Sequence, residues 1–113
     1  MRILAAFTMV LLAGVACNQT SNQTANQVAM QDFSFSPESL NVSVGDTVTW
    51  VNQGAVDHTT TSGEVGNPDG AWDSGIVAPG ASYRHAFATA GNFHYYCTLH
   101  GASNGMKGVI AVH

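Results

Sequence analysis

The chain has 113 residues, of which 45% are hydrophobic and only 9% are charged, and its formal net charge is −4 at pH 7. This length allows a single domain with a small core. Three cations cannot neutralise a phosphate backbone, so the composition excludes nucleic acid as a partner.

The chain begins with a short apolar stretch, Ile3 to Ala16, that follows a cation and ends in small residues. It is too short to span a bilayer, and residues 1–16 are therefore predicted to be a signal peptide of an exported protein. The next residue, Cys17, lies where a bacterial lipoprotein would receive its lipid. Lipid attachment at Cys17 would hold the protein in the periplasm or on the outer face of a bacterial membrane. The alternative is simple cleavage near Ala16, with Cys17 left as an ordinary thiol.

The segment that follows is polar and uncharged, and it contains two copies of N-Q-T. Such a composition cannot form a core. Residues 17–27 are therefore predicted to comprise the attachment cysteine and a flexible tether, and residues 28–113 the folded domain. Without residues 1–16, the formal charge becomes −5, because Arg84 and Lys107 contribute two positive charges and the carboxylates contribute seven negative ones.

The predicted domain consists of short runs rich in Val, Thr, Phe and Tyr, separated by Gly, Pro and Asn. No amphipathic helix of useful length is indicated. Close spacing of short strands is typical of an all-β, Greek-key β-sandwich, here with about seven to eight strands. The strand candidates are residues 28–31, 39–44, 47–52, 58–62, 82–87, 92–97 and 108–113.

Two of these candidates, 82–87 and 92–97, are separated by a turn through Ala90 and Gly91 and are predicted to form a hairpin. Strand alternation places His85 between aromatic side chains that face the core, so we interpret His85 as a core residue rather than a metal ligand. The opposite parity predicts that His94 and Tyr96 point outward.

The run Y-Y-C-T-L-H-G-A-S-N-G-M contains the residues with metal-binding chemistry. Cys97 offers a thiolate, His100 an imidazole and Met106 a thioether, a mixture of soft sulfur and nitrogen ligands that suits copper. His58, from a separate segment, would complete a set of two histidines and one cysteine with a weak axial sulfur, the pattern of blue-copper sites.

Further motifs accompany these residues in the same order: D-F-S-F-S-P-E-S-L-N-V-S-V-G-D-T-V-T-W-V-N, H-T-T-T-S, W-D-S-G, A-P-G-A-S-Y and G-N-F-H-Y-Y-C-T-L-H. Together they resemble the cupredoxin superfamily, and within it the plastocyanin-like branch that includes plastocyanin, amicyanin and pseudoazurin. The resemblance covers residues 28 to 113. It implies a cupredoxin-like sandwich with one type 1 copper per chain, held equatorially by His58, Cys97 and His100 and axially by Met106.

The resemblance also implies a function. The chain would be a monomeric single-electron carrier, not an enzyme, that serves redox protein donors and acceptors. Electrons would pass through His100, within an apolar patch to which Leu99, Gly101, Ala102 and Met106 could contribute, and Tyr96 could offer a second route. The backbone N–H of Thr59 would point toward the Cys97 sulfur.

The spacing of the axial ligand departs from the family pattern. Plastocyanin and pseudoazurin commonly place four residues between the second histidine and the methionine, whereas five separate His100 from Met106. Gly101 and Gly105 give this loop the freedom to absorb an extra residue. The alternative is that Met106 is an ordinary core or surface methionine.

Two other functions compete with electron transfer. A copper enzyme such as an oxidase would need a second copper centre. Multicopper oxidases resemble one another in an H-C-H run that leads to this centre, and the run is absent here because Cys97 lies between Tyr96 and Thr98. A copper-binding or copper-delivery protein often has clusters of methionine or histidine, whereas this domain has only Met30 and Met106. Copper delivery remains the alternative hypothesis.

Overall fold

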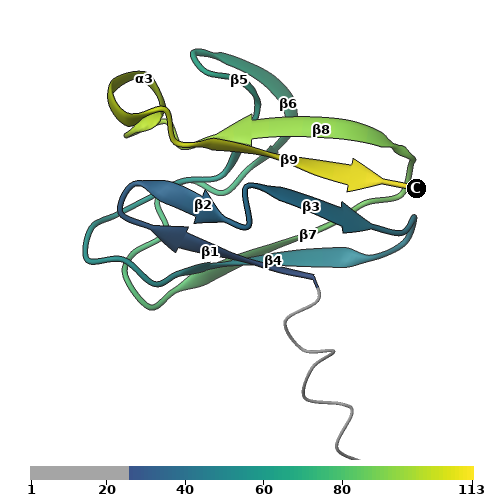
Figure 1. The fold of residues 1–113 in the computed structure, drawn as a ribbon, viewed down its shortest axis with the longest axis horizontal. Helices are drawn as coiled ribbons and strands as arrows, with labels where there is room; N and C mark the ends of the chain where they lie inside the picture. The colour runs from purple at the N-terminus through teal and green to yellow at the C-terminus, as the bar shows by residue number, and fades with distance from the viewer. Residues whose placement is uncertain (1–25) are drawn as a thin grey trace, which may run out of the picture.

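The computed structural model describes residues 26–113, which form two β-sheets packed face to face (Figure 1). The predicted signal peptide, Cys17 and all but the end of the predicted tether lie outside the described residues. Within residues 26–113, no helix is long and apolar enough to cross a membrane.

One sheet has four strands and the other has five. The four-stranded sheet has the order β2-β1-β4-β7, and its members are β1 (Gln27–Gln31), β2 (Ser34–Ser36), β4 (Thr47–Asn52) and β7 (Ser82–Ala86). The five-stranded sheet has the order β3-β9-β8-β5-β6, with β3 (Ser39–Val42), β5 (Thr61–Glu64), β6 (Asn67–Asp73), β8 (Gly91–Tyr96) and β9 (Lys107–Val112). A short helix, α3 (Gly101–Asn104), lies between β8 and β9. The predicted all-β sandwich is confirmed.

Two strand pairs are parallel, β1 with β4 and β3 with β9. Because β1 and β4 run in the same direction, the turn that follows β1 and the loop that follows β4 meet at one end of the sandwich. The segment between β8 and β9 lies at that same end, on the left in Figure 1, whereas the carboxyl terminus lies at the other end. The topology therefore gathers three loops around one place.

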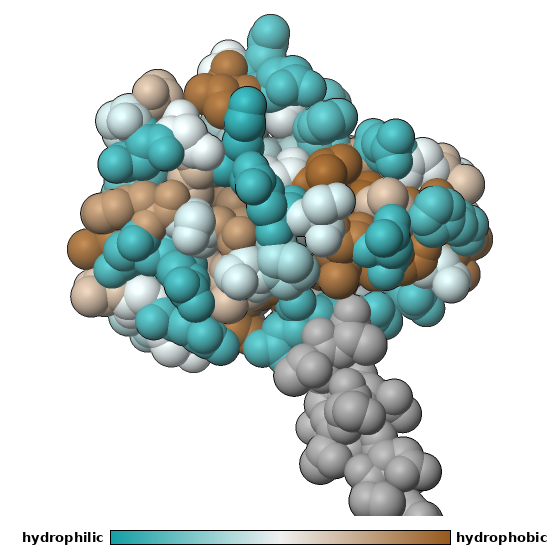
Figure 2. All heavy atoms as spheres, viewed as in Figure 1, coloured by the Kyte–Doolittle hydropathy of each residue, from teal (hydrophilic) through white to brown (hydrophobic). Residues whose placement is uncertain are grey.

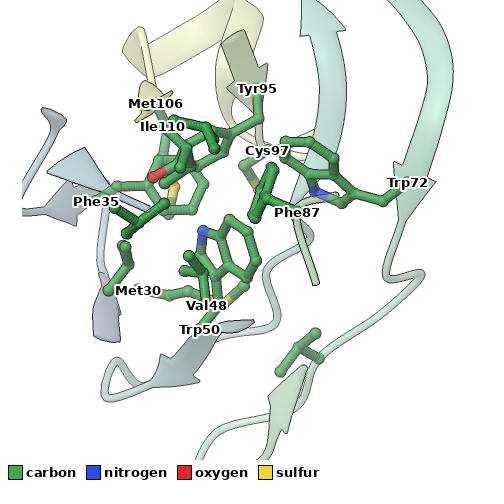
Figure 3. Packing of buried hydrophobic residues seen from close by; sticks show 14 residues of the cluster. Met30, Phe35, Val48, Trp50, Trp72, Phe87, Tyr95, Cys97, Met106 and Ile110 are labelled. Carbon is green, nitrogen blue, oxygen red and sulfur yellow. The ribbon is translucent and has the colours of Figure 1, made fainter. Parts of the chain in front are cut away.

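Aromatic side chains from both sheets fill the core between them. Trp50 of β4 meets Tyr95 of β8 with ring centroids 5.4 Å apart, and Trp72 of β6 lies 5.6 Å from Trp50 (Figure 3). Trp50 and Tyr95 are each at most 1% exposed. Burying such large rings in a small domain contributes several kcal/mol of stability, on the order of 2 to 3 kcal/mol for each ring.

The structure has nine strands among the described residues, rather than the seven to eight predicted. The two additional strands are β2, which has three residues, and β6, which begins in the Gly- and Pro-containing segment between the strand candidates 58–62 and 82–87. In β6, only Trp72 is buried. β2 alternates as Ser-Phe-Ser but is too short for the alternation to mark a strand, and β6 has no alternation of apolar and polar residues.

The predicted hairpin between residues 82–87 and 92–97 is wrong. β7 pairs with β4, whereas β8 pairs with β9 and β5, so the two strands lie in different sheets. Their aromatic residues do meet, since Phe87 and Phe93 lie 5.3 Å apart, but they meet across the core. Alternation alone cannot distinguish strands that pair side by side from strands that face one another.

His85 packs against core aromatic residues, as predicted, but it is only half-buried. Its ring lies 4.9 Å from Trp72 and 4.8 Å from Phe87, and burial lowers its pKa. His94 is exposed, as predicted. The expectation that Tyr96 points outward into solvent is wrong, because Tyr96 is 5% exposed and is covered by Gly101. The turn of α3 folds back over this face of β8.

Candidate metal centre

Three donor atoms converge at the end of the sandwich where the loops meet. His58 Nδ1 and His100 Nδ1 lie 3.2 Å apart, and Cys97 Sγ lies 3.9 Å from the first and 3.6 Å from the second. His58 and Cys97 are completely buried, whereas His100 is partly exposed. The structure therefore brings together the three residues that the sequence analysis selected as equatorial ligands.

The spacing of these atoms fits a single metal ion. Metal–nitrogen bonds are about 2.0 Å long and metal–thiolate bonds about 2.3 Å, so three donors in a plane around one ion would lie about 3.5 to 3.8 Å apart. The observed separations of 3.2 to 3.9 Å bracket these values. A thiolate with two imidazoles is also the donor set that suits copper in both of its oxidation states.

Backbone pairing fixes the position of His58 between β4 and β5. His58 forms an isolated bridge with Val77, in which each N–H donates to the other's carbonyl at 3.1 and 2.8 Å. The buried Asn52 side chain holds this bridge, because its Nδ2 donates to the carbonyls of Val77 and Val56 and its Oδ1 accepts from the Gly54 N–H. A fully bonded buried amide makes the loop around His58 rigid.

Thr59 joins the two segments that carry the candidate ligands. Its backbone N–H points at Cys97 Sγ at 3.4 Å, which agrees with the expectation from the resemblance. Its hydroxyl accepts a hydrogen bond of 2.9 Å from the N–H of Thr98, the residue that follows Cys97. A hydrogen bond to a ligand sulfur withdraws electron density from it, and groups of this kind tune the redox properties of a metal site.

The segment from Cys97 to Met106 is a closed loop. The Cys97 N–H donates to the Met106 carbonyl at 3.0 Å, and the Gly101 N–H donates to the Cys97 carbonyl at 2.7 Å. Gly105 ends α3 in the left-handed conformation, with φ of 67°, and thereby accommodates the longer spacing. Met106 is 1% exposed, which excludes a surface methionine. Its axial role remains a prediction.

Asp32, in the turn between β1 and β2, contacts His58 from the side opposite the cluster. Its Oδ1 accepts a hydrogen bond of 2.7 Å from His58 Nε2, and its Oδ2 accepts one of 2.8 Å from the Ala55 N–H. These hydrogen bonds, with that from Ala55 the larger contribution, hold the pKa of the Asp32 carboxyl below its ordinary value.

The outer face of the cluster is partly apolar. Phe33 is 43% exposed and packs edge-on against His100 with ring centroids 4.8 Å apart, and Leu99 is 46% exposed. The expected composition of the patch needs correction, because Gly101 and Met106 are buried and cannot form a surface. Phe33 takes part instead, because the β1–β2 turn reaches across to His100.

Three residues around the cluster were not identified as functional from the sequence: Asp32, Phe33 and Asn52. The one signal for Phe33 was a large apolar residue just after the strand candidate 28–31, because the segments between strands normally expose polar residues. No comparable signal marks Asp32 or Asn52, since each is a common polar residue near a strand end and acquires its role only through contacts across the fold.

Comparisons with known proteins agree with this geometry. Residues 22–113 match the copper binding proteins of the plastocyanin/azurin family. The chain belongs to this family. Plastocyanin of Scenedesmus fuscus is 39% identical over 84 residues, which cover 69% of this chain and 85% of the relative. Copper is therefore confirmed as the cofactor, with one cluster for one ion among the described residues.

Solved structures extend the comparison. A purple cupredoxin from Nitrosopumilus maritimus superposes with a TM-score of 0.70 and 28% identity, covering 77% of this chain and 98% of that protein. A copper-containing nitrite reductase from Thermus scotoductus has a TM-score of 0.66 and 29% identity over 77% of this chain, but the match covers only 22% of the enzyme. The sandwich therefore occurs both as a free-standing protein and as a part of a larger enzyme.

Proposed function

We propose that this protein is a single-electron carrier that uses one type 1 copper site, with His58, Cys97 and His100 as equatorial ligands and Met106 as the axial ligand. The observation that supports it best is the convergence of two imidazole nitrogens and one buried thiol within 3.9 Å of one another, in a family of copper-binding proteins. Bound copper would supply the one-electron couple between Cu(II) and Cu(I).

The surrounding residues are suited to fast electron transfer because they leave the ligands little freedom to move. The bridge with Val77 holds His58, and the hydrogen bonds of Thr59 join the His58 segment to the Cys97 segment. Little reorganisation is then needed when the charge of the site changes. The complete burial of Cys97 also keeps water away from the thiolate.

We infer that redox partners dock on the exposed apolar residues around His100, here called the His100 face: Phe33, Leu99, His100 and Ala102. Figure 2 shows brown and tan atoms at the left end of the view, where Figure 1 places the β1–β2 turn and the loop after β4. His100 is the candidate ligand that reaches this surface. A small apolar contact supports weak binding and quick release, which suit a carrier that meets partners in turn.

Two alternative functions, nitrite reduction and copper delivery, would each require a metal site of a different kind. Nitrite reduction would require a second copper centre, and residues 26–113 contain one cluster of metal-binding side chains. Copper delivery would require a site that releases its ion readily, whereas Cys97 and His58 are completely buried and both are tied to neighbouring segments. We therefore favour the carrier, supported by similarity to a plastocyanin.

Leu99→Glu tests the docking surface. Leu99 is 46% exposed beside His100, so a carboxylate there should slow electron exchange with a redox partner at least several-fold without loosening copper. The matched control is Val44→Glu, because Val44 is 49% exposed and its N–H is bonded to the carbonyl of the C-terminal residue at the other end of the sandwich. Stopped-flow measurement of exchange rates distinguishes the two variants.

The same preparation tests the carrier against the delivery protein. We expect the protein to retain its copper through repeated oxidation and reduction in the presence of a modest Cu(I) chelator. Equal exchange rates for Leu99→Glu and Val44→Glu would contradict docking at the His100 face. Loss of Cu(I) to the chelator at each reduction, without efficient electron exchange, would favour copper delivery.

Met106→Gln tests the axial ligand. An amide oxygen is harder than a thioether and favours Cu(II), so the variant should retain copper and show a lower reduction potential. A tenfold gain in relative affinity for Cu(II) corresponds to about 59 mV in a one-electron couple, and we expect at least that change in cyclic voltammetry. An unchanged potential and spectrum would mean that Met106 is only a core residue.

We further propose that the protein is exported and held at a membrane by lipid on Cys17. Several acyl chains, each contributing about 0.8 kcal/mol per buried methylene, would hold the domain firmly. Cys17→Ala should leave copper binding intact and release the protein into the soluble fraction, as measured by fractionation and intact mass. An unmodified Cys17 thiol in soluble mature protein would contradict the anchor.

A further inference from the structure

We propose that Asp32 is a positioning residue for the metal centre: it orients His58 through Nε2 and, by its negative charge, stabilises the more highly charged oxidation state of the bound ion. The inference rests on the proposed function and extends it to a residue outside the ligand set. The observation is a carboxylate in hydrogen-bond contact with the outer nitrogen of a completely buried imidazole.

The geometry assigns the hydrogen of His58. An ionised carboxylate can only accept hydrogen bonds, so the 2.7 Å contact with Asp32 Oδ1 requires His58 Nε2 to be the donor. Neutral imidazole carries a single N–H, which leaves the lone pair of Nδ1 free. Nδ1 is the atom that faces Cys97 Sγ and His100 Nδ1. Asp32 therefore selects the tautomer that can bind the ion.

The position of the carboxylate is itself fixed. The second oxygen of Asp32 accepts a hydrogen bond of 2.8 Å from the Ala55 N–H, so both oxygens are engaged. Gly54 leaves the space that the carboxylate occupies, because a Cβ at Gly54 would overlap Asp32 Oδ1 and lie 2.8 Å from its Cγ. The loop after β4 thus forms a cradle for a side chain from the β1–β2 turn.

A charged partner on a ligand imidazole makes that ligand more basic and favours the higher oxidation state. Removing the charge should therefore weaken Cu(II) binding more than Cu(I) binding and raise the reduction potential. Asparagine is a demanding replacement, because an NH₂ donor takes the place of one carboxylate oxygen and would face the N–H of either His58 or Ala55. We expect about a tenfold loss of relative affinity for Cu(II), which corresponds to a rise of about 59 mV.

The first experiment compares Asp32→Asn with Asp57→Asn in the full chain. Asp57 precedes His58, is exposed, and has no side-chain hydrogen bond to His58 within the described residues, so its variant removes a nearby charge without removing the contact. The readouts are the reduction potential by voltammetry and the Cu(II) and Cu(I) affinities by competition with chelators. Asp32→Asn should raise the potential clearly more than Asp57→Asn.

The second experiment leaves Asp32 in place and disturbs its cradle. Gly54→Ala should displace the carboxylate from His58 and raise the potential in the same direction as Asp32→Asn. Its effect should be much smaller in an Asp32→Ala background, because the added methyl group then meets no carboxylate and only the backbone N of residue 32, at 3.2 Å, remains close. Thermal unfolding of each metal-free variant checks that the sandwich is retained.

The outcomes separate this inference from the proposed function. If the unsubstituted protein binds copper and cycles reversibly but Asp32→Asn and Asp57→Asn have equal potentials, the role of Asp32 is refuted and the carrier stands. The same holds if Gly54→Ala acts equally with and without Asp32. If the unsubstituted protein forms no coloured, reversible copper site, the proposed function fails and the inference fails with it.

Discussion

Replacement of Cys97 by serine is expected to abolish the intense visible absorption of the copper-loaded protein. The absorption requires a soft thiolate that donates charge to Cu(II), and a hydroxyl cannot replace it. Cys97 is completely buried and lies within 3.9 Å of both candidate histidine ligands, so no other described cysteine could take its place. Titration with Cu(II), followed by absorption spectroscopy, measures the effect.

The substitution is nearly isosteric, so the fold should persist and the two histidines should still bind some metal. His94→Gln provides the control, because His94 is exposed and belongs to β8, the strand that leads to Cys97. That variant should retain the full band. A Cys97→Ser protein as intensely coloured as the parent would refute the ligand assignment.

Replacement of Gly63 by alanine should lower the free energy of unfolding of the metal-free protein more than any other substitution proposed above. Gly63, in β5, has φ of +121°, a region that side chains rarely adopt, and a Cβ there would overlap Asn67 O and lie 2.9 Å from Asp69 N. Backbone strain of about 1 to 2 kcal/mol adds to a steric cost of about 1 to 3 kcal/mol. This sum is a large part of the 5–15 kcal/mol typical of whole domains.

Gly66→Ala is a matched control for this effect. Gly66 lies in the turn of the same β5–β6 hairpin and also has a positive φ of +81°, but a Cβ there meets nothing within 4 Å. It should lose only the backbone contribution, about 1 to 2 kcal/mol. Urea unfolding of the metal-free proteins compares the two. Equal losses would show that the hairpin relaxes and that the close approach of β6 costs little.

The sequence predicted the sandwich and the cluster of His58, Cys97 and His100 because both depend on local features. Short apolar runs between turn residues define strands wherever they occur, and thiolate, imidazole and thioether have distinctive metal chemistry. Cys97 and His100 are also only three residues apart, so the chain itself keeps them close. His58 was selected because the run from Cys97 to Met106 lacks a third equatorial ligand, and the resemblance to a known family then supported the choice.

What the sequence could not predict depends on contacts between distant segments. Tyr96 has the parity of an outward-facing residue, and only the turn of α3 over β8 buries it. β7 and β8 follow one another in the chain, but they pair with different neighbours. Asp32 meets His58 across 26 residues of sequence. In each case the deciding information is which distant segments the fold brings together.

The direction of β1 determines where the amino-terminal segment joins the domain relative to the His100 face. The described chain enters the sandwich at the start of β1 and reaches the Asp32–Phe33 turn at its end, a strand of five residues that spans about 17 Å (Figure 1). Whatever is joined upstream of the domain therefore connects away from the His100 face. A protein immobilised on an electrode through its amino-terminal segment would be attached at a point remote from the surface through which we infer that electrons pass.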